Sequence, residues 1–272
     1  LILTTMFKQI SSAQNTYIKE LFQLKEKSRT RKKTGQFLIE GYREILLASK
    51  GNFKISTLLF DETIISNEKV EALISEINNK VEVIQVSNDV YRKLAYRTTT
   101  EGVFAVSNSK NLELKTLSLS NNPLILIAEA PEKPGNIGAL LRTADAAGID
   151  AVIIANPKTD MFNPNIIRSS VGCVFTNQIA TGTTSEIISF LKEKNISIYC
   201  AALSASKNYS TINYNNASAI VVGTEATGLS NEWLENSTQN IIIPMRGKID
   251  SMNVSVSAAI ITFEAVRQRT IN

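Results

Sequence analysis

The chain has 272 residues and a formal net charge of +4, with 43% hydrophobic and 20% charged residues. This balance is typical of a soluble globular protein with two ordinary domains, and it excludes a disordered or membrane-embedded chain. The chain contains no histidine, which excludes Ser-His-Asp and Cys-His nucleophile systems and most catalytic zinc sites.

The cysteines and the N-terminus indicate the compartment. Cys173 and Cys200 are too few for a disulfide framework and too far apart for a metal knuckle. The first residues contain no basic region followed by a long hydrophobic segment, and no stretch approaches the length of a membrane span. We therefore expect a cytoplasmic protein that binds neither a metal ion nor a membrane.

A basic segment lies near the N-terminus, where residues 19–33, KELFQLKEKSRTRKK, include seven basic and two acidic residues. We predict a basic helical segment over residues 1–33. A localised positive surface favours contact with nucleic-acid phosphates, and Arg31, Lys32 and Lys33 are the candidate contacts. The alternative is a solvated helix and tail.

Residues 34–107 alternate between extended and helical patterns. The predicted strands are 36–39, 55–60, 81–86 and 103–106. Three helices are predicted: one begins near Gly41, and the other two cover about 67–77 and 89–94. A small α/β domain is the natural fold for this alternation.

A Ser- and Asn-rich segment, residues 108–122, is predicted to link this domain to a second α/β domain over residues 123–272. The strands of the second domain are nearly continuous apolar runs, typical of a parallel sheet covered on both faces. Its predicted strands are 124–128, 151–155, 196–202, 217–222 and 240–243, and its predicted helices are 137–147, 185–194 and 253–269.

The first candidate loop is APEKPGNIGALLRTADAAG, residues 130–148, which leaves a strand and enters a helix. Asn136 is placed to cap that helix. The apolar stripe of the helix leaves Arg142 off its buried face. Arg142 is either a surface partner of Asp145 at i+3 or a group that projects along the helix edge.

The second candidate loop is VVGTEATGLS, residues 221–230. Gly223 and Gly228 have the spacing of half a P-loop, but Leu229 stands where the phosphate-binding lysine is needed, so this is not a Walker motif. A glycine at a strand end allows close approach of a ligand, and Glu225 is a hydrogen-bond acceptor beside it. The alternative is an ordinary strand-to-helix turn.

The third candidate loop lies in IIIPMRGKIDSMNVSVSAAIITFEAV, residues 241–266, where a strand is followed by a helix. Ser251 and Asn253 stand at the helix start, where they cap the helix, take part in catalysis, or both. The helix is apolar nearly all round and is expected to be buried, against another element or a second subunit. All three loops follow strands, so we expect them to meet at the carboxyl edge of one sheet, the usual ligand site.

The motifs NIGALLRTADAAG, VVGTEATGLS and IPMRGKIDSMNVSVSAA, in this order, resemble the three motifs of the SpoU (TrmH-like) family of RNA ribose methyltransferases in the SPOUT superfamily. The resemblance covers residues 123–269. GQFLIEGYREILLAS and TTTEGVFAV, residues 35–49 and 98–106, resemble the N-terminal substrate-binding domain of the family.

The resemblance implies an α/β fold with a small ribosomal-protein-like domain and a Rossmann-like parallel sheet containing a trefoil knot. It implies methyl transfer from S-adenosylmethionine to a ribose 2′-hydroxyl of RNA, with 23S ribosomal RNA favoured, by a homodimer. The same reaction on transfer RNA, or an inactive RNA-binding protein of this fold, are the alternatives.

The resemblance also implies roles for individual residues. The candidate catalytic residues are Asn136, Arg142, Glu225, Ser251 and Asn253. The candidate cofactor-binding residues are Leu203, Gly223, Ile243, Met245 and Met252, the last of which replaces a leucine found in many members. Arg43 and Arg97 join Arg31, Lys32 and Lys33 as candidate RNA contacts. Arg142 either helps to remove the hydroxyl proton or, because guanidinium is a poor base, binds a phosphate while Asn136 and Ser251 orient the hydroxyl.

Overall fold

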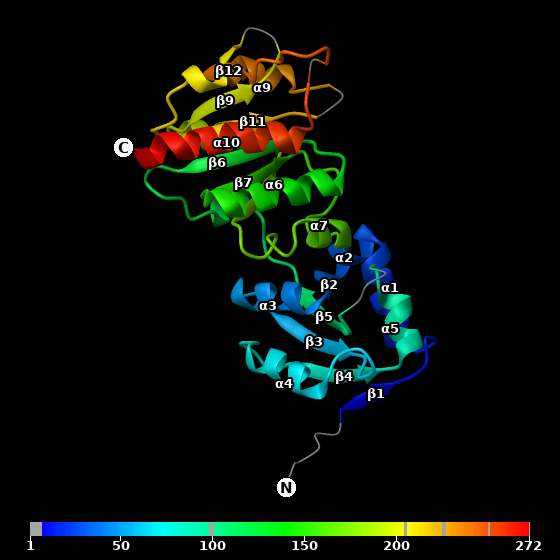
Figure 1. Cartoon of the computed structure of the whole chain (residues 1–272). Helices are drawn as coiled ribbons and strands as arrows, with labels where there is room; N and C mark the ends of the chain where they lie inside the picture. The colour runs from blue at the N-terminus through cyan, green and yellow to red at the C-terminus, as the bar shows by residue number, and fades with distance from the viewer. Residues whose placement is uncertain (1–6, 98–100, 204–205, 225–226, 250, 272) are drawn as a thin grey trace. The chain divides into compact units, whose positions relative to one another are not determined.

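The structure is a computed structural model that describes residues 7–97, 101–203, 206–224, 227–249 and 251–271. The chain divides into two compact units. The first unit comprises Leu1–Lys110 and Asp160–Thr176, and the second comprises Asn111–Thr159 and Asn177–Asn272. Both units are α/β, as predicted (Figure 1).

The first unit contains a five-stranded sheet in the order β1 (Lys8–Ile10), β4 (Glu82–Val86), β3 (Ile55–Phe60), β5 (Val103–Asn108) and β2 (Gln36–Glu40). Strands β1, β4 and β3 are parallel, whereas β5 runs antiparallel to both of its neighbours. The helices of this unit are α1 (Thr16–Glu26), α2 (Ser28–Thr34), α3 (Tyr42–Lys50), α4 (Asn67–Ser75), α5 (Asn88–Leu94) and α7 (Pro164–Ser169). Helices α1 and α5 pack together on one face of the sheet, and α3 and α4 lie on the other (Figure 1).

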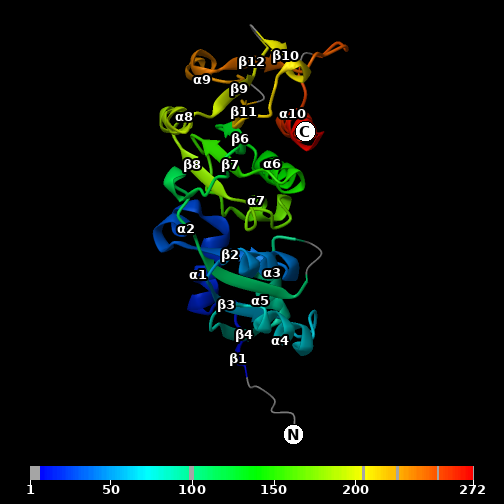
Figure 2. The ribbon, with the colours of Figure 1, turned by 90° about the vertical axis from the view of Figure 1, so that its left-hand side faces the viewer.

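The second unit contains a seven-stranded sheet whose strands are all parallel. Their order is β10 (Lys207–Asn208), β12 (Gln239–Ile242), β9 (Ser197–Ala201), β11 (Ser218–Val222), β6 (Leu124–Glu129), β7 (Ala151–Ala155) and β8 (Ile179–Gly182). Helices α6 (Pro134–Ala147) and α10 (Val254–Ile271) cover one face, and α8 (Thr184–Glu193) and α9 (Asn231–Asn236) cover the other (Figure 2). The parallel sheet covered on both faces is thus confirmed.

The elements absent from the sequence prediction are short. They include β1, β8, β10, α7 and α9, none longer than six residues. The 3₁₀ turns η1 (Leu114–Thr116) and η2 (Tyr209–Thr211) were not predicted either. Elements of this length show too few repeats of a hydrophobic period to be recognised.

The segment Asp160–Thr176 lies between β7 and β8 in sequence, yet it packs with the first unit. Phe162 stacks on Phe37 of β2 with ring centroids 4.4 Å apart, and Phe175 stacks on the same ring at 6.0 Å. By its position in the sequence this segment was predicted to belong to the second domain. Its aromatic side chains instead pack against the five-stranded sheet of the first unit. The predicted linker also contributes to a core, because Leu114, Leu117 and Leu119 pack against the second unit.

One expectation about the start of a helix was wrong. Helix α6 begins at Pro134 with Lys133 as its N-cap, so Asn136 lies inside the first turn and is not the cap. Proline is favoured at the first helical position because its missing N–H would have no partner there.

Within a single copy of the chain, helix α10 is buried along one side. Its buried side chains Ala258, Ile261, Thr262 and Ala265 form one stripe. Val256 and Phe263, seven residues apart and therefore on one face, are 47% and 46% exposed. Helix α10 packs on α6, β11 and η2, and these contacts leave Val256 and Phe263 about half exposed within the described chain.

Candidate active site

A cavity of ≈ 470 Å³ opens beside the carboxyl ends of β9, β11 and β12 in the second unit. The residues that follow these strands, together with the start of α10, form its walls. Ligands of parallel α/β sheets bind at this edge. The predicted meeting of the second and third loops at one edge is therefore observed.

All five candidate cofactor-binding residues line this cavity. Leu203 follows β9, Gly223 follows β11, Ile243 and Met245 follow β12, and Met252 precedes α10. Leu203 is 64% exposed. Its apolar side chain is available to a ligand in the cavity.

Gly223 is required by the folding of its own loop. A Cβ atom at this position would lie 2.2 Å from the carbonyl carbon of Gly228 and 2.5 Å from the nitrogen of Leu229. Thr224 and Gly228 exchange two backbone hydrogen bonds of 3.1 Å, so the loop doubles back on the end of β11. The glycine allows close approach of backbone to backbone, not only of a ligand to the strand end.

Asn136 and Asn253 connect the first and third loops. The Nδ2 of Asn253 donates a hydrogen bond to the Oδ1 of Asn136 at 3.2 Å. The Oδ1 of Asn253 accepts from the backbone nitrogen and the Oγ of Ser255 at 3.0 and 2.6 Å, so Asn253 also caps α10. Asn253 stands between Met252 and Val254, which line the cavity, as does Ser251. This asparagine pair therefore lies at the rim of the cavity.

The remaining candidate catalytic residues are placed differently. Arg142 is exposed on α6, six residues after Asn136 and about 9 Å farther along the helix axis. It is not among the lining residues of the cavity. Glu225 lies outside the described residues, so its candidate role stays a prediction.

The cavity provides few charges. Every described lining residue is apolar, a glycine, a serine or a threonine. Cys200 lies in the core of the same unit, and burial raises the pKa of its thiol to about 12, so it is a neutral packing group and not a nucleophile. The described residues contain no cluster of side chains suited to a metal ion. The walls can therefore bind a ligand mainly through apolar contacts, hydroxyl groups and backbone polar groups.

The candidate RNA contacts of the first unit fall into two groups. Lys32, Lys33 and Arg43 are exposed. Arg31 is only 5% exposed and forms a two-pronged ion pair with Asp160, with Nε–Oδ1 and Nη2–Oδ2 distances of 3.0 and 2.8 Å. Its guanidinium is already used within the chain, which removes Arg31 from the candidate contacts.

Arg97 is also engaged within the first unit. It is paired with the buried Glu44, although 22% of its side chain is exposed. Desolvation lowers the pKa of Arg97, whereas the hydrogen bond to Glu44 raises it. The pKa of Arg97 is raised overall. Most of its charge is therefore offset by a neighbour.

The aromatic side chain of Tyr96 was not predicted to be a functional group. Tyr96 is 43% exposed, and the guanidinium carbon of Arg168 lies 5.4 Å from its ring centroid. The Tyr96 hydroxyl donates to the Oδ1 of Asn165 at 2.7 Å, which fixes the ring. Aromatic rings paired with arginine are surfaces on which unpaired RNA bases stack. No local signal identifies this pair, because its two members are far apart in sequence.

No helix of the described chain is long and apolar enough to cross a membrane.

Comparisons with known proteins agree with the geometry. The SpoU rRNA Methylase family model matches residues 123–263, and the MRM3-like substrate binding domain model matches residues 15–105. The chain is 32% identical over 258 residues to the 23S rRNA (guanosine(2553)-2'-O)-methyltransferase RlmP of Bacillus subtilis (strain 168), covering 94% of this chain and 98% of that protein.

Solved structures show the same likeness over nearly the whole chain. A crystal structure of an RNA 2'-O ribose methyltransferase matches with a TM-score of 0.83 and 37% identity, covering 96% of this chain and 99% of the other. The AdoMet-bound rRNA methyltransferase from Sinorhizobium meliloti matches with a TM-score of 0.88 and 26% identity, covering 96% and 98%.

Proposed function

Because the chain belongs to the SpoU rRNA Methylase family, we propose that it transfers a methyl group from S-adenosylmethionine to a ribose 2′-hydroxyl of 23S ribosomal RNA. The observation that carries this proposal is the convergence of the three loops. The second and third loops line one cavity, and the Asn253–Asn136 hydrogen bond joins the first loop to it. The relative from Bacillus subtilis is named for this reaction on 23S rRNA.

The cavity fits S-adenosylmethionine. Its ≈ 470 Å³ falls within the range of about 300–1,000 Å³ that is usual for ligand sites. Ile243, Met245 and Met252 would hold the apolar parts of the cofactor, and backbone groups after β9 and β11 would hold its polar parts. When bound, S-adenosylmethionine supplies the reactive methyl group.

The residues of the chain would position the hydroxyl that accepts the methyl group. Asn136 and Asn253 form a hydrogen-bonded pair of amides at the rim, and Ser251 lines the same cavity. Arg142 is exposed on the helix that carries Asn136, and guanidinium is a poor base but a strong phosphate ligand. We infer that Arg142 binds a phosphate beside the target ribose and so orients the hydroxyl.

Replacement of Arg142 tests this role. Arg142→Ala is expected to abolish turnover while binding of S-adenosylmethionine stays close to that of the wild type, because Arg142 does not line the cavity. Single-turnover kinetics and calorimetric titration of the cofactor separate the two effects. Lys194→Ala removes an exposed cation after α8, on the opposite face of the sheet, and is the control. Normal turnover in Arg142→Ala would refute the assignment.

The activity itself is tested with labelled cofactor. Purified protein is incubated with radiolabelled S-adenosylmethionine and total RNA from a strain that lacks the enzyme, and labelled nucleotides are mapped. Label on a ribose of 23S RNA is the expected result. Label on transfer RNA would overturn the substrate, and absence of label from all RNA, assembly intermediates included, would favour an RNA-binding protein without activity.

The first unit would provide the RNA-binding surface. Lys32 and Lys33 on α2 and Arg43 on α3 supply sequence-independent phosphate contacts, and Tyr96 with Arg168 supplies a stacking surface. Work on ribosomal RNA would place the protein in the cytoplasm.

We propose that the chain forms a homodimer, and the second apolar stripe of α10 supports this proposal. Val256 and Phe263 are exposed on one face of a long helix, and a second copy of the chain would cover them. The trefoil knot implied by the family stays a prediction.

A further inference from the structure

A chain of side-chain hydrogen bonds around Glu129 joins the carboxyl ends of neighbouring strands in the second unit. Glu129 is the last residue of β6 and is 7% exposed. Its Oε1 accepts hydrogen bonds from the Ser230 Oγ at 2.8 Å and the Thr184 Oγ1 at 3.0 Å. Its Oε2 accepts the backbone N–H of Ser230 at 2.8 Å. Thr184 also accepts from the Nδ2 of Asn156, which follows β7, at 2.9 Å. One buried carboxyl group thus binds two loops from different strands.

The side chain of Ser230 forms a hydrogen bond with Glu129 and does not cap its own helix. It is the N-cap of α9, and a serine hydroxyl at this position ordinarily accepts a backbone N–H of its own helix. Here the hydroxyl forms no capping bond, and both the hydroxyl and the N–H of Ser230 donate to Glu129. The position of Ser230 is therefore determined by Glu129 rather than by the start of α9.

Ser230 ends the loop that lines the cofactor cavity. We call the described residues Gly223, Thr224 and 227–230 the β11 loop. Five of them, all except Ser230, line the cavity. Strand β11 holds one end of this loop, and the hydrogen bonds of Ser230 to Glu129 hold the other. Glu129 itself is not among the lining residues, so any effect on a ligand must pass through the loop.

We propose that Glu129 is a positioning residue for the cofactor, which holds the β11 loop in the conformation that lines the cavity. A preformed wall binds a ligand more tightly because less ordering is required on binding. Without Glu129, the hydroxyl and the backbone N–H of Ser230 lose the buried carboxylate that fixes this end of the loop, and water can satisfy both groups without holding the loop in place. This inference rests on the proposed function, since it assigns the cavity to S-adenosylmethionine.

Calorimetric titration of S-adenosylmethionine into the full chain tests the inference without RNA. Glu129→Leu and Ser230→Ala are each expected to weaken cofactor binding by about tenfold or more. Ser230→Ala removes the hydroxyl without removing a helix cap, so this variant keeps the fold even if Glu129→Leu does not. The double variant is expected to bind no more weakly than Glu129→Leu, because both changes break the same contact. In the methylation assay KM for the cofactor rises, whereas kcat at saturating cofactor stays unchanged.

Thr184→Val is the matched control. It removes the other partner of the same carboxyl group, on the side of α8, and is expected to lower thermal stability while cofactor affinity is unchanged. Wild-type affinity in Ser230→Ala, or an equal loss of affinity in Thr184→Val, would overturn the positioning role. Failure of the wild-type chain to bind S-adenosylmethionine would instead overturn the proposed function.

Discussion

At the scale of single residues, Arg31 shows that burial can reverse the role suggested by charge. The guanidinium also donates to the backbone oxygens of Leu24 and Lys25 at 2.6 and 3.0 Å, in addition to the pair with Asp160. The exposed fractions of the two paired side chains are 5% and 11%. Arg31 thus ties α1 and α2 to the segment Asp160–Thr176 within the first unit.

Arg31→Ala is therefore expected to destabilise the first unit and to leave the second unit unchanged. Removal of one partner of a buried ion pair costs about 3–5 kcal/mol, since the other charge is left buried. Trp233, the single tryptophan, is buried in the second unit, so its fluorescence reports that unit, while far-UV circular dichroism reports both during urea unfolding. Lys32→Ala, at an exposed neighbour, should leave both signals unchanged. Unchanged stability of Arg31→Ala would contradict a structural role.

Gly223 offers a second test at this scale. A methyl group in Gly223→Ala would meet backbone atoms that cannot rotate away, and overpacking of this kind costs about 1–3 kcal/mol. The β11 loop must then open, and cofactor affinity measured by calorimetry should fall. Gly135→Ala is the control, because a Cβ at Gly135 meets no atom within 4 Å. Equal affinities in the two variants would show that the fold of the loop does not affect binding.

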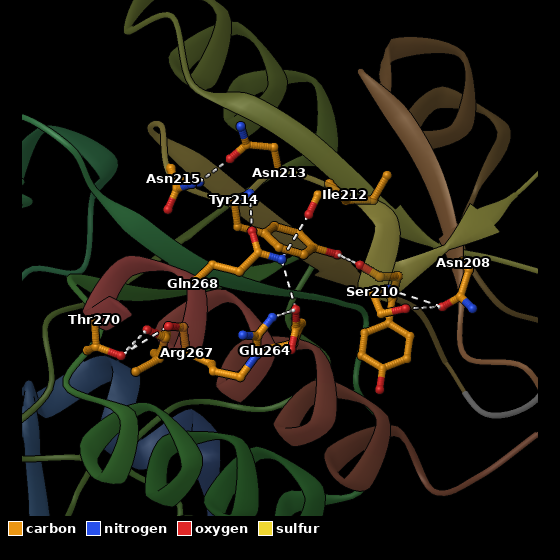
Figure 3. A network of polar contacts seen from close by, with 12 residues as sticks. Asn208, Ser210, Ile212, Asn213, Tyr214, Asn215, Glu264, Arg267, Gln268 and Thr270 are labelled. Carbon is orange, nitrogen blue, oxygen red and sulfur yellow. Dashed lines mark hydrogen bonds and ion pairs between the residues drawn. The ribbon is translucent and has the colours of Figure 1, made fainter. Parts of the chain in front are cut away.

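At the scale of elements, the last turns of α10 hold the loop that precedes β11. Figure 3 shows Gln268 between this loop and Glu264. Its Oε1 accepts the backbone N–H of Tyr214 at 2.9 Å, and its Nε2 donates to the Ile212 oxygen at 2.9 Å and to Glu264 at 2.8 Å. Hydrogen bonds from Arg267 and Gln268 lower the pKa of Glu264 to about 2. A depressed carboxyl pKa stabilises the fold above the unfolded value of 4.5, and this contribution is lost as the pH falls towards 2.

Gln268→Leu is expected to lower the free energy of unfolding of the second unit by about 1–3 kcal/mol, because the Tyr214 N–H and the Ile212 oxygen lose their partner. Trp233 fluorescence during urea unfolding measures this change. Arg267→Ala breaks only a pair whose arginine is 58% exposed, and pairs of this kind contribute little. A larger effect of Arg267→Ala than of Gln268→Leu would contradict the anchoring role of Gln268.

At the scale of the whole molecule, the exposed stripe of α10 predicts the assembly state. Phe263→Glu places a charge in the centre of the proposed interface and is expected to convert a dimer into a monomer in sedimentation velocity. Ser189→Glu adds the same charge on an exposed position of α8, on the other face of the sheet, and should remain dimeric. A monomeric wild-type chain, or a dimeric Phe263→Glu variant, would contradict the proposal.

Much of the fold could be predicted from the sequence because its larger elements carry local signals. The predicted strand over 55–60 is β3 itself, and the predicted helix over 185–194 is α8 shifted by one residue. The apolar stripe of Ile137, Leu140, Leu141 and Ala144 is buried as predicted. Four candidate cofactor-binding residues that line the cavity stand within the ordered motifs, namely Gly223, Ile243, Met245 and Met252, whereas Leu203 lies outside them.

Contacts between residues far apart in the chain could be identified only in the folded structure. Arg31 forms an ion pair with Asp160, the Tyr96 ring packs against the guanidinium of Arg168, and Ser230 donates hydrogen bonds to Glu129. The same holds for Asp160–Thr176, whose phenylalanines join a sheet formed by an earlier part of the chain. Hydrophobic periods, turns and motif order could be recognised in the sequence alone, because these features depend on neighbours within a few residues. Pairing of buried charges and hydroxyls depends on which elements pack together, and that is settled only when the whole chain has folded.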